Sequence, residues 1–307
     1  MPSPFLSRRG VAAALAASAL LLSACGDDGG DAATDDAAPT EAALPSVSVD
    51  EQLAALVPEE VAEDGVITVG SDTTYAPSEF IAEDGETIVG FDVDLFSLVA
   101  QKLGLEAEFR SADFGSIIAG VGSGRYEVGV SSFTINPERL AQANMVSYYS
   151  AGTQWATRKG NPDDVDPDNA CGLAVAVQAN TVQVDDITAR SQECEANGEE
   201  PIDIQQFEAQ SDATAAIASG RVAAGLADSP VMAYAVQQTN GQLELLGDIY
   251  EAAPYGYVVP QAQTEFAEAL AGAVRALIDE GAYTEVLENW GVEAGAIDDP
   301  TVNPTVG

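Results

Sequence analysis

From Val66 onward the chain alternates short apolar segments with longer amphipathic ones. The short segments have strand character, and apolar residues recur at helical spacing in the longer segments. We expect strands at residues 66–71, 87–89, 106–110 and 127–131, and helices at 92–103, 114–122 and 136–144. This order predicts a mostly parallel sheet with helices on both faces, and so an α/β fold.

A second α/β unit follows an acidic, proline-containing stretch at residues 161–169. Its strands are expected at 173–178, 202–207, 222–227, 244–246 and 255–259, and its helices at 181–190, 211–219 and 230–238, before two closing helices at 264–278 and 284–290. Segments 152–158 and 256–259 have the character of two connections between the units. The prediction is therefore two lobes, with lobe 1 at 63–153 and 254–296, lobe 2 at 154–253, and a tail at 297–307. A site is expected in the cleft, at the ends of the parallel strands.

The first 24 residues have the pattern of an export signal. Arg8 and Arg9 precede a short apolar run, which ends in Leu22-Ser23-Ala24-Cys25. This ending resembles a bacterial lipobox, which implies lipidation of Cys25 and attachment to the outer face of the cell membrane. Residues 25–62 are rich in Ala, Asp and Glu, and we expect an acidic, disordered tether there, with a short helix around Pro58.

The formal charge of the chain is −39, from 50 acidic and 11 basic residues, and there is no histidine. This charge argues against a nucleic-acid partner, because phosphates would be repelled. A strongly hydrated surface and adaptation to high salt are both compatible with it. The lack of histidine removes the commonest general base and metal ligand, so no cofactor and no metal site is predicted.

Two cysteines remain after Cys25. Cys171 and Cys194 lie in an exported chain, where thiols commonly pair, so we expect a structural disulfide between them.

Several ordered motifs connect the chain with a known family. They are Ser71-Asp72-Thr73-Thr74-Tyr75-Ala76-Pro77, Gly90-Phe91-Asp92-Val93-Asp94-Leu95, Gly129 to Arg139, Ala227-Asp228-Ser229-Pro230, and Asn289-Trp290-Gly291. Together they resemble the extracellular solute-binding proteins of family 3, over about residues 66–292. The resemblance implies a two-lobed, periplasmic-binding-protein-like fold of type II with a two-strand hinge. It also implies capture of a polar amino acid for the membrane subunits of an ABC importer.

The resemblance also implies a set of ligand-binding residues. Arg139 would bind the α-carboxylate of the ligand, with the N–H groups of Ser132, Thr134 and Thr181. Asp228 would bind the α-ammonium group. The remaining positions are Asp72, near the ligand side chain, the packing residues Tyr75 and Phe114, and the neighbouring Ser131, Gln178 and Val182. Where the family has a Gly-Thr-Thr-like turn, this chain has Ala179-Asn180-Thr181-Val182.

Physical chemistry supports the same site. A zwitterion needs one fixed cation, one fixed anion and neutral donors, and Arg139 and Asp228 lie on different predicted lobes. Binding and lobe closure would then be a single event. Glutamine, glutamate and basic amino acids all stay open as ligands.

Alternatives to a transport receptor are a sensory ligand-binding module and a dehydratase-like enzyme on the same fold. The enzyme would need an acid/base pair in the cleft, for which Asp72 and Glu79 are the early candidates. Asp92 and Asp94 are interpreted as residues that cap and stabilise the start of a helix, not as a metal pair.

Overall fold

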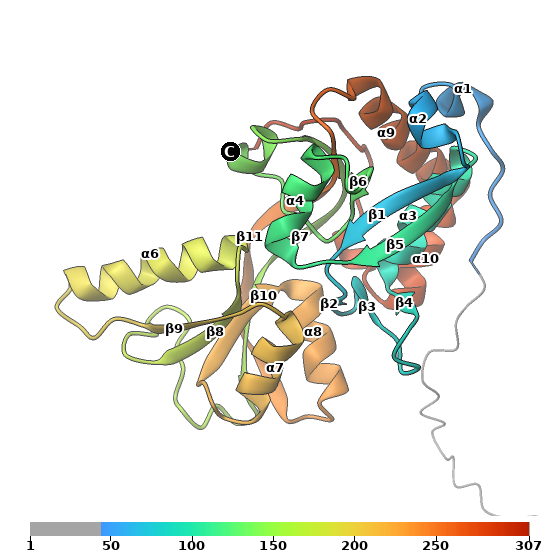
Figure 1. Ribbon diagram of the computed structural model, residues 1–307. Coiled ribbons are helices and arrows are strands. Elements are labelled where there is room, and N and C mark those ends of the chain that lie inside the picture. The colour runs from blue at the N-terminus through green and yellow to red at the C-terminus, as the bar shows by residue number, and fades with distance from the viewer. Residues whose placement is uncertain (1–43, 307) are drawn as a thin grey trace, which may run out of the picture. The chain divides into compact units, whose positions relative to one another are not determined.

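The computed structural model describes residues 44–306, and one eight-stranded sheet runs through this part of the chain (Figure 1). Its strand order is β5-β1-β6-β11-β7-β10-β8-β9. The strands are β1 (Val66–Ser71), β5 (Glu106–Ser111), β6 (Val128–Gly129), β7 (Asn144–Arg158), β8 (Ala174–Gln178), β9 (Asp203–Phe207), β10 (Ala224–Asp228) and β11 (Leu243–Val259). Pairing is parallel within each lobe and antiparallel where β7 and β11 meet their neighbours. The α/β prediction is confirmed.

Strands β7 and β11 are long, pair with each other in antiparallel fashion and pass through both lobes. We expected separate strands at 244–246 and 255–259, and this was wrong because β11 is continuous. Its middle part is exposed and carries register shifts between Leu246 and Tyr250 and between Tyr250 and Ala253. The apolar pattern therefore breaks in the sequence although the strand does not.

In lobe 1, two separate hydrophobic cores lie on the two faces of the sheet. On one face, apolar side chains of α3 (Phe91–Lys102), α9 (Thr264–Glu280) and α10 (Ala282–Trp290) pack against β1, β6 and β7. On the other, α4 (Phe114–Gly122) packs with Phe133, Met145 and Val258. A small second sheet joins β2 (Thr74–Tyr75), β3 (Glu79–Ile81) and β4 (Ile88–Val89). The sequence pattern did not predict β2 and β3.

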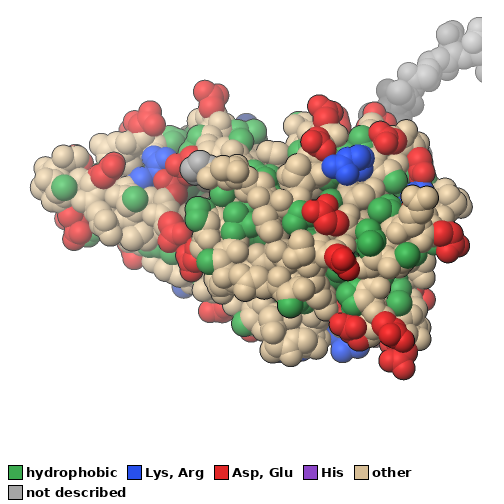
Figure 2. Space-filling view, turned by 90° about the horizontal axis from the view of Figure 1, so that it is seen from above, with side chains coloured by type: hydrophobic (Ala, Val, Ile, Leu, Met, Phe, Trp, Pro, Cys, Tyr) green, Lys and Arg blue, Asp and Glu red, His purple; other side chains and the backbone are tan. Residues whose placement is uncertain are grey.

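Lobe 2 repeats this layering. Helices α7 (Gln210–Ala218) and α8 (Ser229–Gln238) share one core, and α6 (Val182–Ala196) lies in another with Trp155, Val175 and Leu226. The expected disulfide joins Cys171 to Cys194, so it links the last turns of α6 to the segment before β8. Acidic side chains are spread over the face of the molecule in Figure 2, with few basic ones between them.

One short helix was expected around Pro58 at the end of the tether, and the structure has two there, α1 (Glu51–Ala54) and α2 (Glu59–Ala62). Val61 is buried, and Leu53 and Val57 pack against the lobe 1 core. The signal, Cys25 and the tether up to residue 43 lie outside the described residues. No helix in the described residues is long and apolar enough to cross a membrane.

The C-terminal tail binds back on the sheet after a short 3-10 helix, η1 (Glu293–Gly295). Val302 forms a bridge with Val146, and Asn303 accepts a hydrogen bond from the Met145 N–H at 2.8 Å. The tail therefore holds the lobe 1 end of β7.

Two local predictions in lobe 1 were wrong. The helix expected at 136–144 is only α5 (Pro137–Leu140), because β7 already begins at Asn144. The N-cap of α3 is Gly90, which has a φ of 141°, and the Cβ of any other residue there would meet the Ser78 carbonyl at 2.0 Å. Asp92 therefore does not cap the helix. It is the second residue of the helix, within its first turn, and is completely buried.

Candidate functional site

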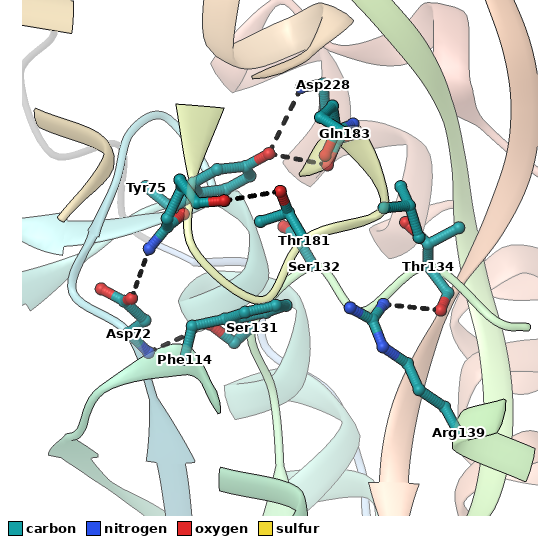
Figure 3. A pocket seen from close by; sticks show the side chains of 12 residues that line it. Asp72, Tyr75, Phe114, Ser131, Ser132, Thr134, Arg139, Thr181, Gln183 and Asp228 are labelled. Carbon is teal, nitrogen blue, oxygen red and sulfur yellow. Dashed lines mark hydrogen bonds between the residues drawn. The ribbon is translucent and has the colours of Figure 1, made fainter. Parts of the chain in front are cut away.

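A narrow pocket lies where the two lobes meet, and twelve described residues line it (Figure 3). All eleven ligand-binding residues predicted from the sequence are among them: Asp72, Tyr75, Phe114, Ser131, Ser132, Thr134, Arg139, Gln178, Thr181, Val182 and Asp228. The walls leave only about 10 Å³ in which the centre of a water molecule can move. An amino acid can therefore enter only if the walls separate.

Gln183 is the one lining residue that the sequence reasoning missed. It lies in the first turn of α6 and is buried, and its Nε2 donates to Asp228 Oδ1 at 2.9 Å and to Thr153 Oγ1 at 3.1 Å. A glutamine two residues after Thr181, at the start of a helix next to the predicted site, was the available signal. Its burial depends on contacts with β7 and β10, which no local pattern shows.

Arg139 brings a cation into the pocket from α5. Asn136 caps this helix by accepting from the Arg139 N–H at 2.9 Å, and Pro137 occupies its first turn. The guanidinium donates to the Thr134 carbonyl at 2.8 Å and, across the lobes, to the Asn180 carbonyl at 3.3 Å. It also lies over the Phe114 ring at 5.3 Å. Burial lowers the pKa of Arg139, and the opposing field of Asp228 limits that shift.

Asp228 supplies the opposite charge from lobe 2. It is the last residue of β10 and occupies the N-cap position of α8, but its side chain makes no capping bond. Instead, the Tyr75 hydroxyl donates to its Oδ2 at 2.8 Å and Gln183 donates to its Oδ1 (Figure 3). Burial raises the pKa of Asp228, while the Tyr75 and Gln183 donors stabilise its carboxylate and oppose that rise.

The acidic end of the pocket lies at Asp72, directly after β1. Its Oδ1 accepts from the N–H and the hydroxyl of Thr74, at 3.1 and 2.7 Å. Its Oδ2 accepts from Gln178 Nε2 of lobe 2 at 2.7 Å. Burial raises the pKa of Asp72. A wider hollow of about 340 Å³, which Asp72 also lines, contains Asp113, Glu208 and one cation, Arg125, so this side of the pocket carries three carboxyl groups and one guanidinium group.

Ser132 has a different role from the expected one. Its backbone is in the left-handed region, with a φ of 49°. We expected its N–H to face a ligand carboxylate, but this N–H donates to Asp92 Oδ2 at 3.1 Å. This N–H is therefore already bonded to a side chain of the protein and is not free to bind a ligand carboxylate.

The turn from Ala179 to Val182 contains no glycine. Asn180 has a φ of 65°, a left-handed conformation that asparagine tolerates better than most residues. The carbonyl of Asn180 accepts from Arg139, and its side chain lies against Gly115, where a Cβ would meet Asn180 Nδ2 at 2.6 Å. After the turn, Thr181 donates its hydroxyl to the Gln178 carbonyl at 2.7 Å, so it does not cap α6. The first N–H groups of α6 are left without a side-chain acceptor.

Two α/β lobes, two long connecting strands and a closed pocket lined by one cation and two carboxyl groups define a two-lobed protein of the periplasmic-binding-protein-like class. The family model of the bacterial extracellular solute-binding proteins, family 3, matches residues 67–293. The chain belongs to this family.

Individual relatives agree with this assignment. The chain is 40% identical over 253 residues to the arginine-binding protein ArgT of Corynebacterium glutamicum, which covers 82% of this chain and 83% of that protein. Among solved structures, an ancestral arginine-binding protein bound to arginine matches with a TM-score of 0.68 and 30% identity, over 74% of this chain and 98% of the other. The same comparison with an ancestral arginine-binding protein bound to glutamine gives a TM-score of 0.67 and 30% identity, over 75% and 99%.

Proposed function

We propose that this protein captures a cationic amino acid, arginine in the first place, and delivers it to the membrane subunits of an ABC importer. The observation that carries the proposal is the order of charges along the pocket. A buried cation, Arg139, and a buried anion, Asp228, line the pocket from different lobes. Asp72 also lines it and adjoins a hollow with two more carboxyl groups and one cation, Arg125.

The carboxylate of the ligand belongs at Arg139. The guanidinium has five N–H donors, and two carbonyl oxygens use two of them. Three donors therefore stay available for a charge-assisted contact at two points. The N-terminus of α6, beginning at Val182, adds uncapped N–H groups and the positive end of a helix dipole on the lobe 2 side.

The ammonium group of the ligand belongs at Asp228. In the closed pocket the Tyr75 hydroxyl and the Gln183 amide donate to this carboxylate. An ammonium group can take the place of the Tyr75 hydroxyl, because both are donors and the ammonium is charged. Tyr75 comes from lobe 1 and Asp228 from lobe 2, so this exchange would couple ligand entry to separation and closure of the lobes.

The charged end of the ligand side chain belongs near Asp72. Glutamine needs one neutral partner there, whereas a guanidinium or ammonium group needs an anion. In the adjoining hollow the carboxyl groups of Asp72, Asp113 and Glu208 outnumber the single cation, Arg125, so its net charge is negative. The arginine-binding relatives support arginine as the first choice, and the glutamine-bound relative keeps glutamine as a weaker second ligand.

The setting of the protein outside the cell follows from the sequence. The lipobox-like Leu22-Ser23-Ala24-Cys25 supports lipid anchoring at Cys25, with the acidic segment behind it as a tether. The enzymatic alternative requires Asp72 and Glu79 to act as an acid/base pair in the cleft. Glu79 is completely buried and does not line the pocket, so the structure does not support this pair.

The test is a thermal-shift screen of the twenty amino acids, followed by calorimetry on the hits. A ligand present at about a thousand times its dissociation constant adds about 4 kcal/mol of stability, and arginine should give the largest shift. Asp72→Asn should weaken arginine binding much more than glutamine binding, whereas Asp248→Asn, an exposed control in β11, should change neither. No shift with any cationic amino acid would refute the proposal, and consumption of a bound hit would indicate an enzyme.

A further inference from the structure

A pair of carboxyl groups lies behind the pocket, out of reach of a ligand. Glu79 on β3 and Asp92 on α3 are both completely buried, and neither lines the pocket. No Lys or Arg among residues 44–306 forms a salt bridge with either of them. Two buried carboxyl groups without a cation are costly unless hydrogen bonds or protons compensate them.

Asp92 is well supplied with donors on one side. Its Oδ2 accepts from the Ser132 N–H at 3.1 Å, from the Ser132 hydroxyl at 3.3 Å and from the Tyr148 hydroxyl at 2.6 Å. Glu79 has one donor, because its Oε1 accepts from the Ser131 hydroxyl at 3.0 Å. The same Ser131 oxygen accepts from the Asp72 N–H at 3.0 Å. The two acids therefore hold Ser131, Ser132 and the backbone of Asp72.

The second carboxyl oxygen of each residue has no hydrogen-bond donor within residues 44–306. Glu79 Oε2 and Asp92 Oδ1 are buried and have no hydrogen-bond partner among the described residues. The two residues are neighbours, because the Asp92 N–H donates to the carbonyl of Ser78 at 3.0 Å and each carboxyl shifts the pKa of the other. Two ionised carboxylates cannot form a hydrogen bond, because both can only accept. One proton between them satisfies both oxygens at once.

We propose that Glu79 and Asp92 share one proton at neutral pH, and that this acid pair positions the Ser131–Ser132 turn of the binding pocket. Asp92 holds the negative charge, because three donors stabilise its carboxylate, and Glu79 carries the proton. The carboxyl of Glu79 then donates to Asp92 and accepts from Ser131, which neither an ionised glutamate nor an apolar residue could do.

The electrostatic surroundings agree with this assignment. Burial raises the pKa of Glu79 well above its usual value, and the neighbouring Asp92 raises it further. Burial also raises the pKa of Asp92, to about 6, against the stabilising bond from Tyr148. The other titratable groups that face the pair are acids as well: Asp72, Tyr75, Tyr148, Tyr149 and Tyr257. No group in this set supplies a positive charge to replace the proton.

The pair matters to the pocket because the turn that it holds is strained. Ser132 has a φ of 49°, a conformation that a serine keeps only when its surroundings enforce it. Both bonds from Ser132 to Asp92 enforce it. Tyr148, the third donor to Asp92, lies on β7 and stacks on Tyr257 of β11 at 4.0 Å. The pair thus connects the floor of the pocket to the two strands that join the lobes.

Two substitutions at Glu79 distinguish the effect of the shared proton from the effect of side-chain size. Glu79→Gln keeps a donor toward Asp92 and an acceptor toward Ser131, so it reproduces the protonated state. Glu79→Met has a similar length and neither group. With L-arginine as the probe, we expect a dissociation constant within about threefold of the unchanged protein for Glu79→Gln, and an increase of about tenfold or more for Glu79→Met. This arm rests on the proposed function, because it requires that L-arginine binds.

Two further measurements need no ligand and therefore fail or succeed independently of the proposed function. The infrared carbonyl band of a protonated, buried carboxyl should be present at neutral pH and absent from Glu79→Gln. The free energy of unfolding should also respond to pH. The folded state holds a proton that the unfolded state releases above pH 4.5, so stability falls as the pH rises from there toward the raised pKa of Glu79. Glu79→Gln lacks this contribution, and its stability relative to the unchanged protein should increase with pH over that range.

The outcomes decide the proposal. Absence of the infrared band at neutral pH, or the same pH dependence of unfolding in both proteins, would overturn the shared proton. Equal binding of L-arginine by Glu79→Met and the unchanged protein would overturn the positioning role. If Glu79→Met does not fold, Tyr148→Phe tests positioning instead, because it removes one donor to Asp92 from outside the pocket and should weaken L-arginine binding severalfold.

Discussion

Replacement of Arg139 by alanine tests the charge arrangement of the pocket most directly. The guanidinium is 8% exposed and uses two of its five N–H donors on the carbonyl oxygens of Thr134 and Asn180. A ligand carboxylate could receive two charge-assisted bonds from the rest, each worth roughly 1.5–3 kcal/mol. Loss of both corresponds to about 3–6 kcal/mol, or about a hundredfold to ten-thousandfold in the dissociation constant.

The fold should survive this change. Arg139 lies on the pocket wall in a four-residue helix, and the cores of both lobes are formed by other residues. Arg221→Ala is a matched control, because Arg221 also stacks on an aromatic ring, Phe207 at 5.2 Å, but does not line the pocket. Arg139→Lys should fall between the two, since it keeps the charge and loses the planar, two-point geometry.

The assay is calorimetric titration with L-arginine, with thermal unfolding of each variant to confirm the fold. Near-native affinity in a folded Arg139→Ala would refute the assignment of the carboxylate to Arg139. Equal losses in Arg139→Ala and Arg221→Ala would show an unspecific effect of charge.

Three other predictions concern separate parts of the chain. Cys171 and Cys194 should resist alkylation until reduced, and their double replacement by serine should lower the free energy of unfolding by about 3 kcal/mol; free labelling of both thiols in the native protein would contradict the bridge. Asn180→Ala should weaken L-arginine binding by about five- to tenfold, and Asn180→Gly should not, because alanine pays roughly 1–2 kcal/mol for the left-handed φ; equal affinities would show that the turn relaxes. The preference for arginine over glutamine should decrease as the pH falls through the raised pKa of Asp72, because the protonated carboxyl no longer attracts a cation; a preference that does not change with pH would place the cationic group elsewhere.

Much of the architecture was predictable, because the spacing of apolar residues along the sequence indicates the individual helices and strands. Helix α4 was predicted with the same bounds as observed, Phe114–Gly122, since its apolar spacing is regular. The eleven predicted lining residues came from the family resemblance, only part of them lying in the quoted motifs, and the structure brings them to one pocket. Strand β11 was divided in the prediction because its exposed middle has no apolar period, although its pairing with β7 continues on both sides.

Charges and hydrogen bonds could not be assigned in the same way. Asp92 has the sequence position of a residue near a helix start, and its interpretation as a cap followed from that position alone. Its partners, Ser132 and Tyr148, are 40 and 56 residues away. Gln183 was missed for the same reason, since its partner Asp228 is 45 residues away.

The amino-acid sequence by itself determined the α/β class, the two-lobed order of elements and the residue types of the pocket, because periodicity and motifs act over neighbouring residues. The tertiary structure alone decided which donors face which acceptors. In the folded chain the Ser132 N–H donates to Asp92, and Tyr75 and Gln183 donate to Asp228. Glu79 lies beside Asp92, and neither carboxyl group is paired with a cation in the described part of the chain. Such pairings depend on burial and on contacts between distant segments, and only the folded chain brings those segments together.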